Sequence, residues 1–179
     1  MRYKMAVKIV LDAGHGGWDN GASFAERKEK NDNLKLTLEV GKILEEMGFE
    51  VEYTRTEDIY QTPFKKATIG NEEEADLFVS IHRNSGPTPN QYQGVETLIY
   101  STGGLPEVVA TSINQHLEEV GYLNLGVEER PNLIVLNSTQ MPAVLVEVGF
   151  INSEADNKLF EERILETAYA IAEGIQDSF

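Results

Sequence analysis

The sequence predicts an α/β fold, a single mixed, largely parallel twisted sheet of about six strands flanked by helices on both faces. Strand and helix patterns alternate along the 179 residues, which favours parallel strands joined by helices. Several strand-like segments are short and almost wholly apolar, which is typical of strands covered on both faces. A chain of this length can bury one substantial core, so we expect a single domain over residues 1–179.

Local patterns place each element along the chain. Short apolar runs predict strands at 9–11, 49–54, 77–81, 95–100, 133–136 and 143–146. Apolar residues repeated every three or four positions, or a residue suited to begin a helix, predict helices at 29–47, within 57–75, at 106–120 and from about 153 to the C-terminus. Gly48 and Pro106 support two of these boundaries, because glycine commonly follows a helix and proline is favoured in its first turn. The polar stretches 18–28 and 84–93 are expected to be loops.

Composition argues against several classes of function. The formal net charge is −15, which disfavours nucleic acid as a partner, because phosphate binding requires clustered Lys and Arg, and gives no support for binding to an anionic membrane. No apolar run approaches the roughly 20 residues of a membrane-spanning helix. The chain contains no cysteine, so any metal must be held by histidine and carboxylates. The N-terminal stretch leads directly into Asp12 and is expected to be a first strand, not a signal peptide.

Two histidines stand where apolar strands end. His15 lies in a glycine-rich turn after 9–11, and His82 follows 77–81. A histidine alone in such a turn is more often a hydrogen-bonding loop residue, but two at neighbouring strand ends would point into one crevice. Imidazole is a common zinc ligand, and a catalytic zinc site needs a third protein ligand and one position open to water. The carboxylate candidates are Asp12, Asp19, Glu26 and Glu29, and spacing alone does not choose between Glu26 and Glu29.

Glu147 is unusual because it ends an otherwise apolar strand in PAVLVEVGF. One explanation is a salt bridge to a residue such as Arg55 or Lys30. The other is a general base whose pKa is raised by its apolar surroundings. The third histidine, His116, lies beside the apolar stripe of 106–120 without a second ligand one turn away, so we expect a structural role for it.

Four segments in order carry a resemblance to a known family: LDAGHGGWDNGA at 11–22, EKNDNL at 29–34, ADLFVSIHRN at 75–84 and MPAVLVEVGFINS at 141–153. Shorter matches are TR at 54–55 and GVET at 94–97. Over essentially its whole length the chain resembles the zinc-dependent N-acetylmuramoyl-L-alanine amidases called amidase type 3. The resemblance implies one Zn²⁺ held by His15, Glu29 and His82, because the family's pattern of Glu, a basic residue and then Asn-Leu falls on Glu29 and not on Glu26. It also implies that Glu147 is the catalytic glutamate.

The activity implied by this resemblance is hydrolysis of the amide between N-acetylmuramic acid and the L-alanine of the peptidoglycan stem peptide. Zinc would activate a water molecule, and Glu147 would take its proton and pass it to the leaving amine. Two alternatives are a zinc peptidase or amide hydrolase of the same scaffold that cuts another cell-wall peptide bond, and a non-catalytic wall-binding module. The intact set of His15, Glu29, His82 and Glu147 argues against the module.

The chain departs from the family at two places. Arg83 stands where the family usually has a small residue, and SFAERK stands where it often has a glycine-rich stretch. We expect Arg83 to pair with a carboxylate of an acidic stem peptide, the alternative being a solvated loop residue, and Asn84 is a second candidate for substrate contact. We also expect a monomer that acts on the bacterial cell wall, as a phage endolysin, an autolysin or a sporulation enzyme, with no separate wall-binding domain in this chain.

Overall fold

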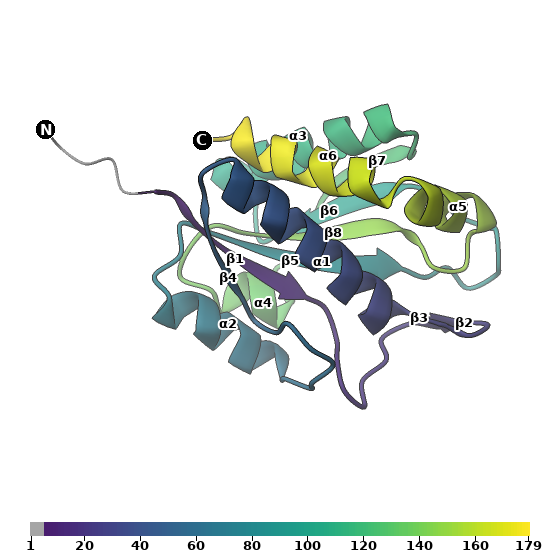
Figure 1. Cartoon of the computed structure of the whole chain (residues 1–179), viewed down its shortest axis with the longest axis horizontal. Coiled ribbons are helices and arrows are strands. Elements are labelled where there is room, and N and C mark those ends of the chain that lie inside the picture. The colour runs from purple at the N-terminus through teal and green to yellow at the C-terminus, as the bar shows by residue number, and fades with distance from the viewer. Residues whose placement is uncertain (1–5) are drawn as a thin grey trace, which may run out of the picture.

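The fold is a six-stranded mixed sheet with helices on both faces (Figure 1), in a computed structural model that describes residues 6–179. Residues 1–5, which the sequence analysis includes in the domain and in the N-terminal stretch, lie outside the described residues. The strand order is β4-β1-β5-β8-β6-β7. Four strands run parallel, namely β4 (Glu50–Tyr53), β1 (Lys8–Ala13), β5 (Leu77–Asn84) and β8 (Ala143–Phe150). The edge pair β6 (Val95–Ile99) and β7 (Asn124–Glu129) runs in the opposite direction.

Helices cover the two faces unequally. The larger layer contains α1 (Glu29–Glu46), α3 (Leu105–Val120), α5 (Glu154–Glu162) and α6 (Ile164–Gln176), and the smaller contains α2 (Pro63–Glu72) and α4 (Ile134–Asn137) (Figure 1). A two-stranded hairpin, β2 (Ser23–Phe24) and β3 (Arg27–Lys28), precedes α1. The fold class predicted from the sequence is therefore confirmed, and no helix within residues 6–179 is long and apolar enough to cross a membrane.

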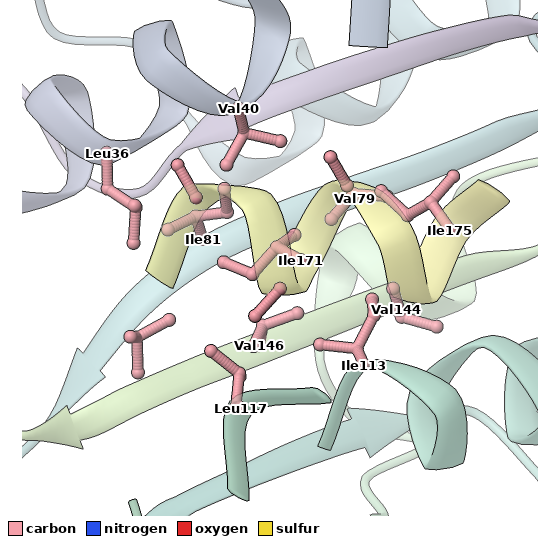
Figure 2. Packing of buried hydrophobic residues seen from close by; sticks show 14 of the residues in the cluster. Leu36, Val40, Val79, Ile81, Ile113, Leu117, Val144, Val146, Ile171 and Ile175 are labelled. Carbon is pink, nitrogen blue, oxygen red and sulfur yellow. The ribbon is translucent and has the colours of Figure 1, made fainter. Parts of the chain in front are cut away.

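Side chains of the central strands alternate between these two layers. Val79 and Ile81 of β5 pack with the larger helical layer, in the cluster shown in Figure 2. Phe78 belongs to the smaller cluster, with Val135 and Leu136 of α4. Because strand side chains alternate with a period of two, the even-numbered residues of β5 face α2 and α4. This alternation determines which side chains near the end of β5 can reach a common site.

Two sequence expectations about secondary structure are wrong. Residues 133–136 were expected to form a strand, but Ile134–Asn137 is the short helix α4, because a four-residue apolar run has the same composition in a buried strand and in a buried helical turn. The strand β7 has the mostly polar sequence NLGVEE and was not expected; as an edge strand exposed along much of its length, it has no apolar pattern to reveal it. The expected loop 18–28 also contains the β2–β3 hairpin.

Candidate active site

Three adjacent parallel strands, β1, β5 and β8, place His15, His82 and Glu147 at the same edge of the sheet. β1 ends at Ala13, two residues before His15, and Gly14 N donates a hydrogen bond to Ile81 O of β5 at 3.0 Å. His82 of β5 is the direct register partner of Glu147 of β8. Residues paired in this way project from the same face, so His82 and Glu147 both lie on the side of the sheet that carries α2 and α4. The carboxyl ends of parallel strands are where open α/β sheets usually place their sites.

Glu29, the first residue of α1, lies between the two histidines. Its Oε2 lies 3.2 Å from His15 Nε2, and its Oε1 lies 3.0 Å from His82 Nδ1. One ligand atom from each of the three residues lies within 4.8 Å of the others. Two imidazole nitrogens and one carboxylate form a donor set typical of catalytic zinc sites, so the residues present fit the ion that the sequence predicts.

The charges in this group favour a cation between the three side chains. Burial would raise the pKa of Glu29, but its contacts with His15 and His82 hold that pKa far below its ordinary range. Burial would lower the pKa of His15, but Glu29 and Asp19 raise it to about 9. The carboxylates therefore draw a proton onto the His15 ring, and a metal ion at the same place would satisfy the same negative charge.

Asp19 orients His15. Its Oδ2 lies 2.8 Å from His15 Nδ1, so this contact leaves Nε2 as the nitrogen that faces Glu29. Hydrogen bonds from carboxylates to the outer nitrogen of a metal-binding histidine are common, because they set the tautomer and the ring orientation. Asp19, one of the candidate ligands in the sequence, contacts His15 Nδ1 and does not belong to the group of His15, Glu29 and His82.

The Glu29 carboxylate is held by its surroundings. Ala22 N donates to Oε2 at 2.8 Å, and Arg83 N donates to Oε1 at 3.1 Å. Asn33, one turn along α1, donates from Nδ2 to Oε1 at 3.2 Å. These donors orient both carboxylate oxygens before any ion binds. This role of Asn33 is not among the sequence predictions, although its i, i+4 spacing from Glu29 is a signal that indicates such a contact.

Glycines provide the space for the group. A Cβ atom at Gly14 would overlap the His82 ring, and one at Gly21 would overlap the Glu29 carboxylate and come within 2.5 Å of His15 Cδ2. His15 itself has a φ of 62°, a conformation that costs a non-glycine residue roughly 1–3 kcal/mol and is concentrated at functional sites.

The other carboxylates considered as the third ligand lie elsewhere. Asp12 is fully buried and pairs with Lys66 Nζ at 2.6 Å, with further hydrogen bonds from Ser80 and Thr54. Burial alone would raise the pKa of Asp12, but these partners hold it below its ordinary value. Glu26 is exposed in the turn of the β2–β3 hairpin. Of the four candidates, only Glu29 lies between both histidines.

Glu147 has a buried oxygen, Oε2, with no hydrogen-bond partner among residues 6–179. Burial raises the pKa of Glu147 to about 7, against a smaller lowering by His82. The salt-bridge explanation is wrong, because Arg55 donates to backbone carbonyls, including Gly14 O at 3.0 Å, and Lys30 pairs with Asp58 at 2.6 Å. A carboxyl group with this pKa can both accept and release a proton near neutral pH.

The structure corrects the expectation for Arg83. β5 continues through Asn84, so Arg83 points to the face opposite His82, beneath α1 and α5. Its guanidinium donates to Asp32 Oδ2 at 2.7 Å, Asn157 Oδ1 at 2.8 Å and Val148 O at 2.7 Å, and the side chain is only 1% exposed. A stem-peptide carboxylate cannot reach it there, and it is not a solvated loop residue either.

Asn84 and His116 both lie outside the metal-competent group, which consists of His15, Glu29 and His82. Asn84 Nδ2 donates to Glu96 Oε1 at 2.8 Å, and Glu96 is the cross-strand partner of Glu147. Glu147, Glu96 and Asn84 therefore form a polar row on this face of the sheet. His116, on α3, contacts Asp177 Oδ2 at 2.8 Å and is separate from the metal-competent group, in keeping with the structural role expected for it.

A pocket of about 300 Å³ opens beside the histidine pair. Its lining includes His15, His82 and Asp19 together with the apolar residues 133–135. Three residues of the stretch 133–136, for which the sequence predicts a strand, therefore line the same pocket as the histidines.

Comparison with known proteins agrees with this geometry. A family model described as N-acetylmuramoyl-L-alanine amidase matches residues 9–177. The endolysin of Bacillus phage SPP1 is 35% identical over 183 residues, which cover 97% of this chain and 66% of the relative. The sporulation-specific N-acetylmuramoyl-L-alanine amidase of Bacillus subtilis (strain 168) is 34% identical over 179 residues, which cover 97% of this chain and 68% of the relative. This chain thus spans about two thirds of the length of these two proteins.

The fold also matches solved structures. The crystal structure of an N-acetylmuramoyl-L-alanine amidase from Clostridium difficile 630 superimposes with a TM-score of 0.90 at 28% identity, over 96% of each chain.

Proposed function

Because this chain belongs to the N-acetylmuramoyl-L-alanine amidase family, we propose that it is a peptidoglycan hydrolase that cleaves the amide bond between N-acetylmuramic acid and the L-alanine of the stem peptide. The observation that carries the proposal is the convergence of His15, Glu29 and His82 beside the unpaired carboxyl group of Glu147. A wall-binding module has no need of this combination.

The proposed metal ligands are His15 Nε2, the Glu29 carboxylate and the His82 ring, with one Zn²⁺ as the cofactor. When bound, the ion would supply a Lewis acid that activates water and polarises the substrate carbonyl. Asp19 keeps His15 in the required tautomer, and the backbone amides of Ala22 and Arg83 keep the Glu29 carboxylate directed at both histidines.

Glu147 is the proposed proton carrier. Its position in register with His82 puts it on the face of the sheet where the water would be activated. The Glu147 carboxylate accepts a proton from the attacking water, and the same carboxyl group then donates it to the leaving amine of L-alanine. We propose that Asn84 contacts the substrate from the same polar row.

The first test is digestion of purified peptidoglycan with and without a chelator, followed by mass spectrometry of the products. Stem peptides with a free N-terminal L-alanine, formed only by the metal-loaded protein, are the expected result. Fragments cut at another peptide bond would identify a different hydrolase on this scaffold. Retention on the wall without released peptide would identify a binding module.

Variants separate the roles of the residues. Glu147→Gln is expected to retain zinc and lose at least about a hundredfold in kcat, as removal of a general base does. His82→Ala is expected to lose zinc, as measured by elemental analysis of the purified protein. His116→Ala is the matched control, because His116 lies outside the metal-competent group, and it should keep both zinc and activity. Full activity of Glu147→Gln would refute the proposed base.

The setting of the activity is also proposed. We place the reaction at the bacterial cell wall, where cell wall amidases and endolysins act. We further propose that residues 1–179 form one catalytic domain that acts as a monomer, which size-exclusion chromatography with light scattering would test.

A further inference from the structure

Trp18 and Tyr60 form an exposed aromatic pair that the proposed chemistry does not use. Trp18 is 75% exposed, more than any other large apolar side chain among the described residues, and Tyr60 is 38% exposed. Their ring centroids lie 4.4 Å apart with an interplanar angle of 38°. Exposed aromatic surface that is paired and concentrated in this way marks binding sites more often than scattered apolar residues do.

The backbone beneath the indole is fixed. Gly16 and Asp19 exchange backbone hydrogen bonds of 2.9 and 3.1 Å, which makes Trp18 part of the tip of a tight turn. Gly17 N donates to Asp58 Oδ1 at 2.8 Å, and Gly17 O accepts from Lys30 Nζ at 2.8 Å. Asp58 and Lys30 also pair with each other at 2.6 Å. A side chain presented on a rigid turn loses little conformational freedom when a ligand binds.

This turn is continuous with the proposed metal site. The residue after Trp18 is Asp19, which contacts His15 Nδ1, and Lys30, which holds the turn, follows Glu29 in α1. The turn that carries Trp18 is therefore joined directly to Asp19 and held by the residue that follows Glu29. The scissile amide of peptidoglycan is borne by a sugar, so sugar rings must lie close to that centre.

We propose that Trp18 and Tyr60 form a stacking platform for N-acetylhexosamine rings of the peptidoglycan glycan strand, an inference that rests on the proposed function. One face of a pyranose ring presents C–H groups that pack on an aromatic ring, while the hydroxyl and acetamido groups remain at its rim. With its lactyl carboxyl group in amide linkage, the glycan strand is uncharged and is not repelled by a protein of net charge −15. Anionic wall polymers would be repelled, so the neutral sugar is the favoured occupant.

The chain provides its own reporter for this site, because Trp18 is its one tryptophan. A tetramer of N-acetylglucosamine should change the tryptophan emission in a saturable manner, in the zinc-loaded and the metal-free protein alike. Binding measured without metal does not depend on hydrolysis, so failure of this inference can be distinguished from failure of the proposed function. No change in emission up to millimolar sugar, or a change produced only by a polyanion such as polyphosphate, would overturn the proposal.

Variants test the platform itself, with binding to insoluble peptidoglycan measured by sedimentation of the metal-free proteins. Trp18→Ala and Tyr60→Ala are expected to raise Kd about tenfold, and Trp18→Phe, which keeps an aromatic face, should raise it less. Tyr169→Ala is the matched control, because Tyr169 is a 45% exposed aromatic residue on α6 in the opposite helical layer. Circular dichroism identifies any variant that fails to fold, and Trp18→Phe then decides the result. Unchanged Kd values in folded variants would refute the platform.

Discussion

Glu147 combines catalytic suitability with a penalty to stability. Its buried Oε2 has no partner within the described part of the chain, and burial raises the pKa of the group to about 7. The folded state therefore binds this proton more tightly than the unfolded state, in which the pKa returns to its ordinary value of 4.5. Above pH 4.5 the unfolded state releases this proton while the folded state retains it, so the free energy of unfolding falls with rising pH until the pH passes about 7.

Glu147→Gln is consequently expected to stabilise the metal-free protein while abolishing activity. At pH 8 the gain in free energy of unfolding should be about 3 kcal/mol, because the pKa is raised from 4.5 to about 7 and each unit corresponds to about 1.4 kcal/mol. The gain should shrink as the pH is lowered and vanish below about 4.5, where Glu147 is protonated in both states. Urea unfolding of both proteins at several pH values measures it, and Glu162→Gln at an exposed position of α5 serves as the control. Equal stabilities at pH 8 would show that the buried carboxylate is not penalised.

At the scale of elements, strand β5 divides its polar residues between two faces. His82 points to the reaction centre, whereas Arg83 points to the opposite face, where its guanidinium contacts α1, α5 and β8 and lies 4.4 Å from the Phe160 ring centroid. The apolar run in the sequence ends at residue 81, so the predicted strand stops before His82 and Arg83, and the alternation of strand side chains does not separate them. Extending the strand by three residues would have placed Arg83 in the interior.

The same reasoning explains what else could be predicted from the sequence. The central strands and long helices were predicted because burial imposes apolar patterns with periods of 2 and 3.6 residues. The edge strand β7 and the one-turn helix α4 lack such patterns, since β7 is largely exposed and α4 is too short to show a period. Residue spacing left Glu26 and Glu29 equivalent as ligands; the family pattern favoured Glu29, which the structure brings together with both histidines. The orienting contact of Asp19 depends on the fold of the turn, and neither spacing nor resemblance indicated it.

Arg83→Ala is expected to destabilise the protein by about 2–5 kcal/mol, because it leaves two backbone carbonyls of β8 without their side-chain donor. Asp32 also loses one of its two cationic partners and keeps only Arg27. Chemical denaturation measures this loss. Arg130→Ala is the matched control: Arg130 is 39% exposed and pairs with Glu128 at the surface, so its removal should cost less than about 1 kcal/mol. A small effect at Arg83, similar to that at Arg130, would contradict the structural role assigned to this side chain.

At the scale of the whole molecule, charge opposes the encounter with a bacterial wall. The net charge of the chain is −15, and a wall that retains its anionic polymers carries charge of the same sign. Repulsion between like charges slows association and acts over the Debye length, about 30 Å at 0.01 M salt and about 8 Å at 0.15 M. Attachment of this chain is then favoured by contacts that do not require opposite charge, such as those proposed for Trp18 and Tyr60.

The rate of digestion of intact walls is therefore expected to rise several-fold when NaCl is increased from about 10 mM to about 150 mM, because added salt screens the repulsion. Peptidoglycan stripped of anionic polymers should show a smaller rise, and binding of a neutral N-acetylglucosamine oligomer should not change. Release of soluble peptide over time at each salt concentration measures the rate. A rate that falls with salt would instead indicate attraction between opposite charges, through a cationic surface that the composition of this chain does not suggest.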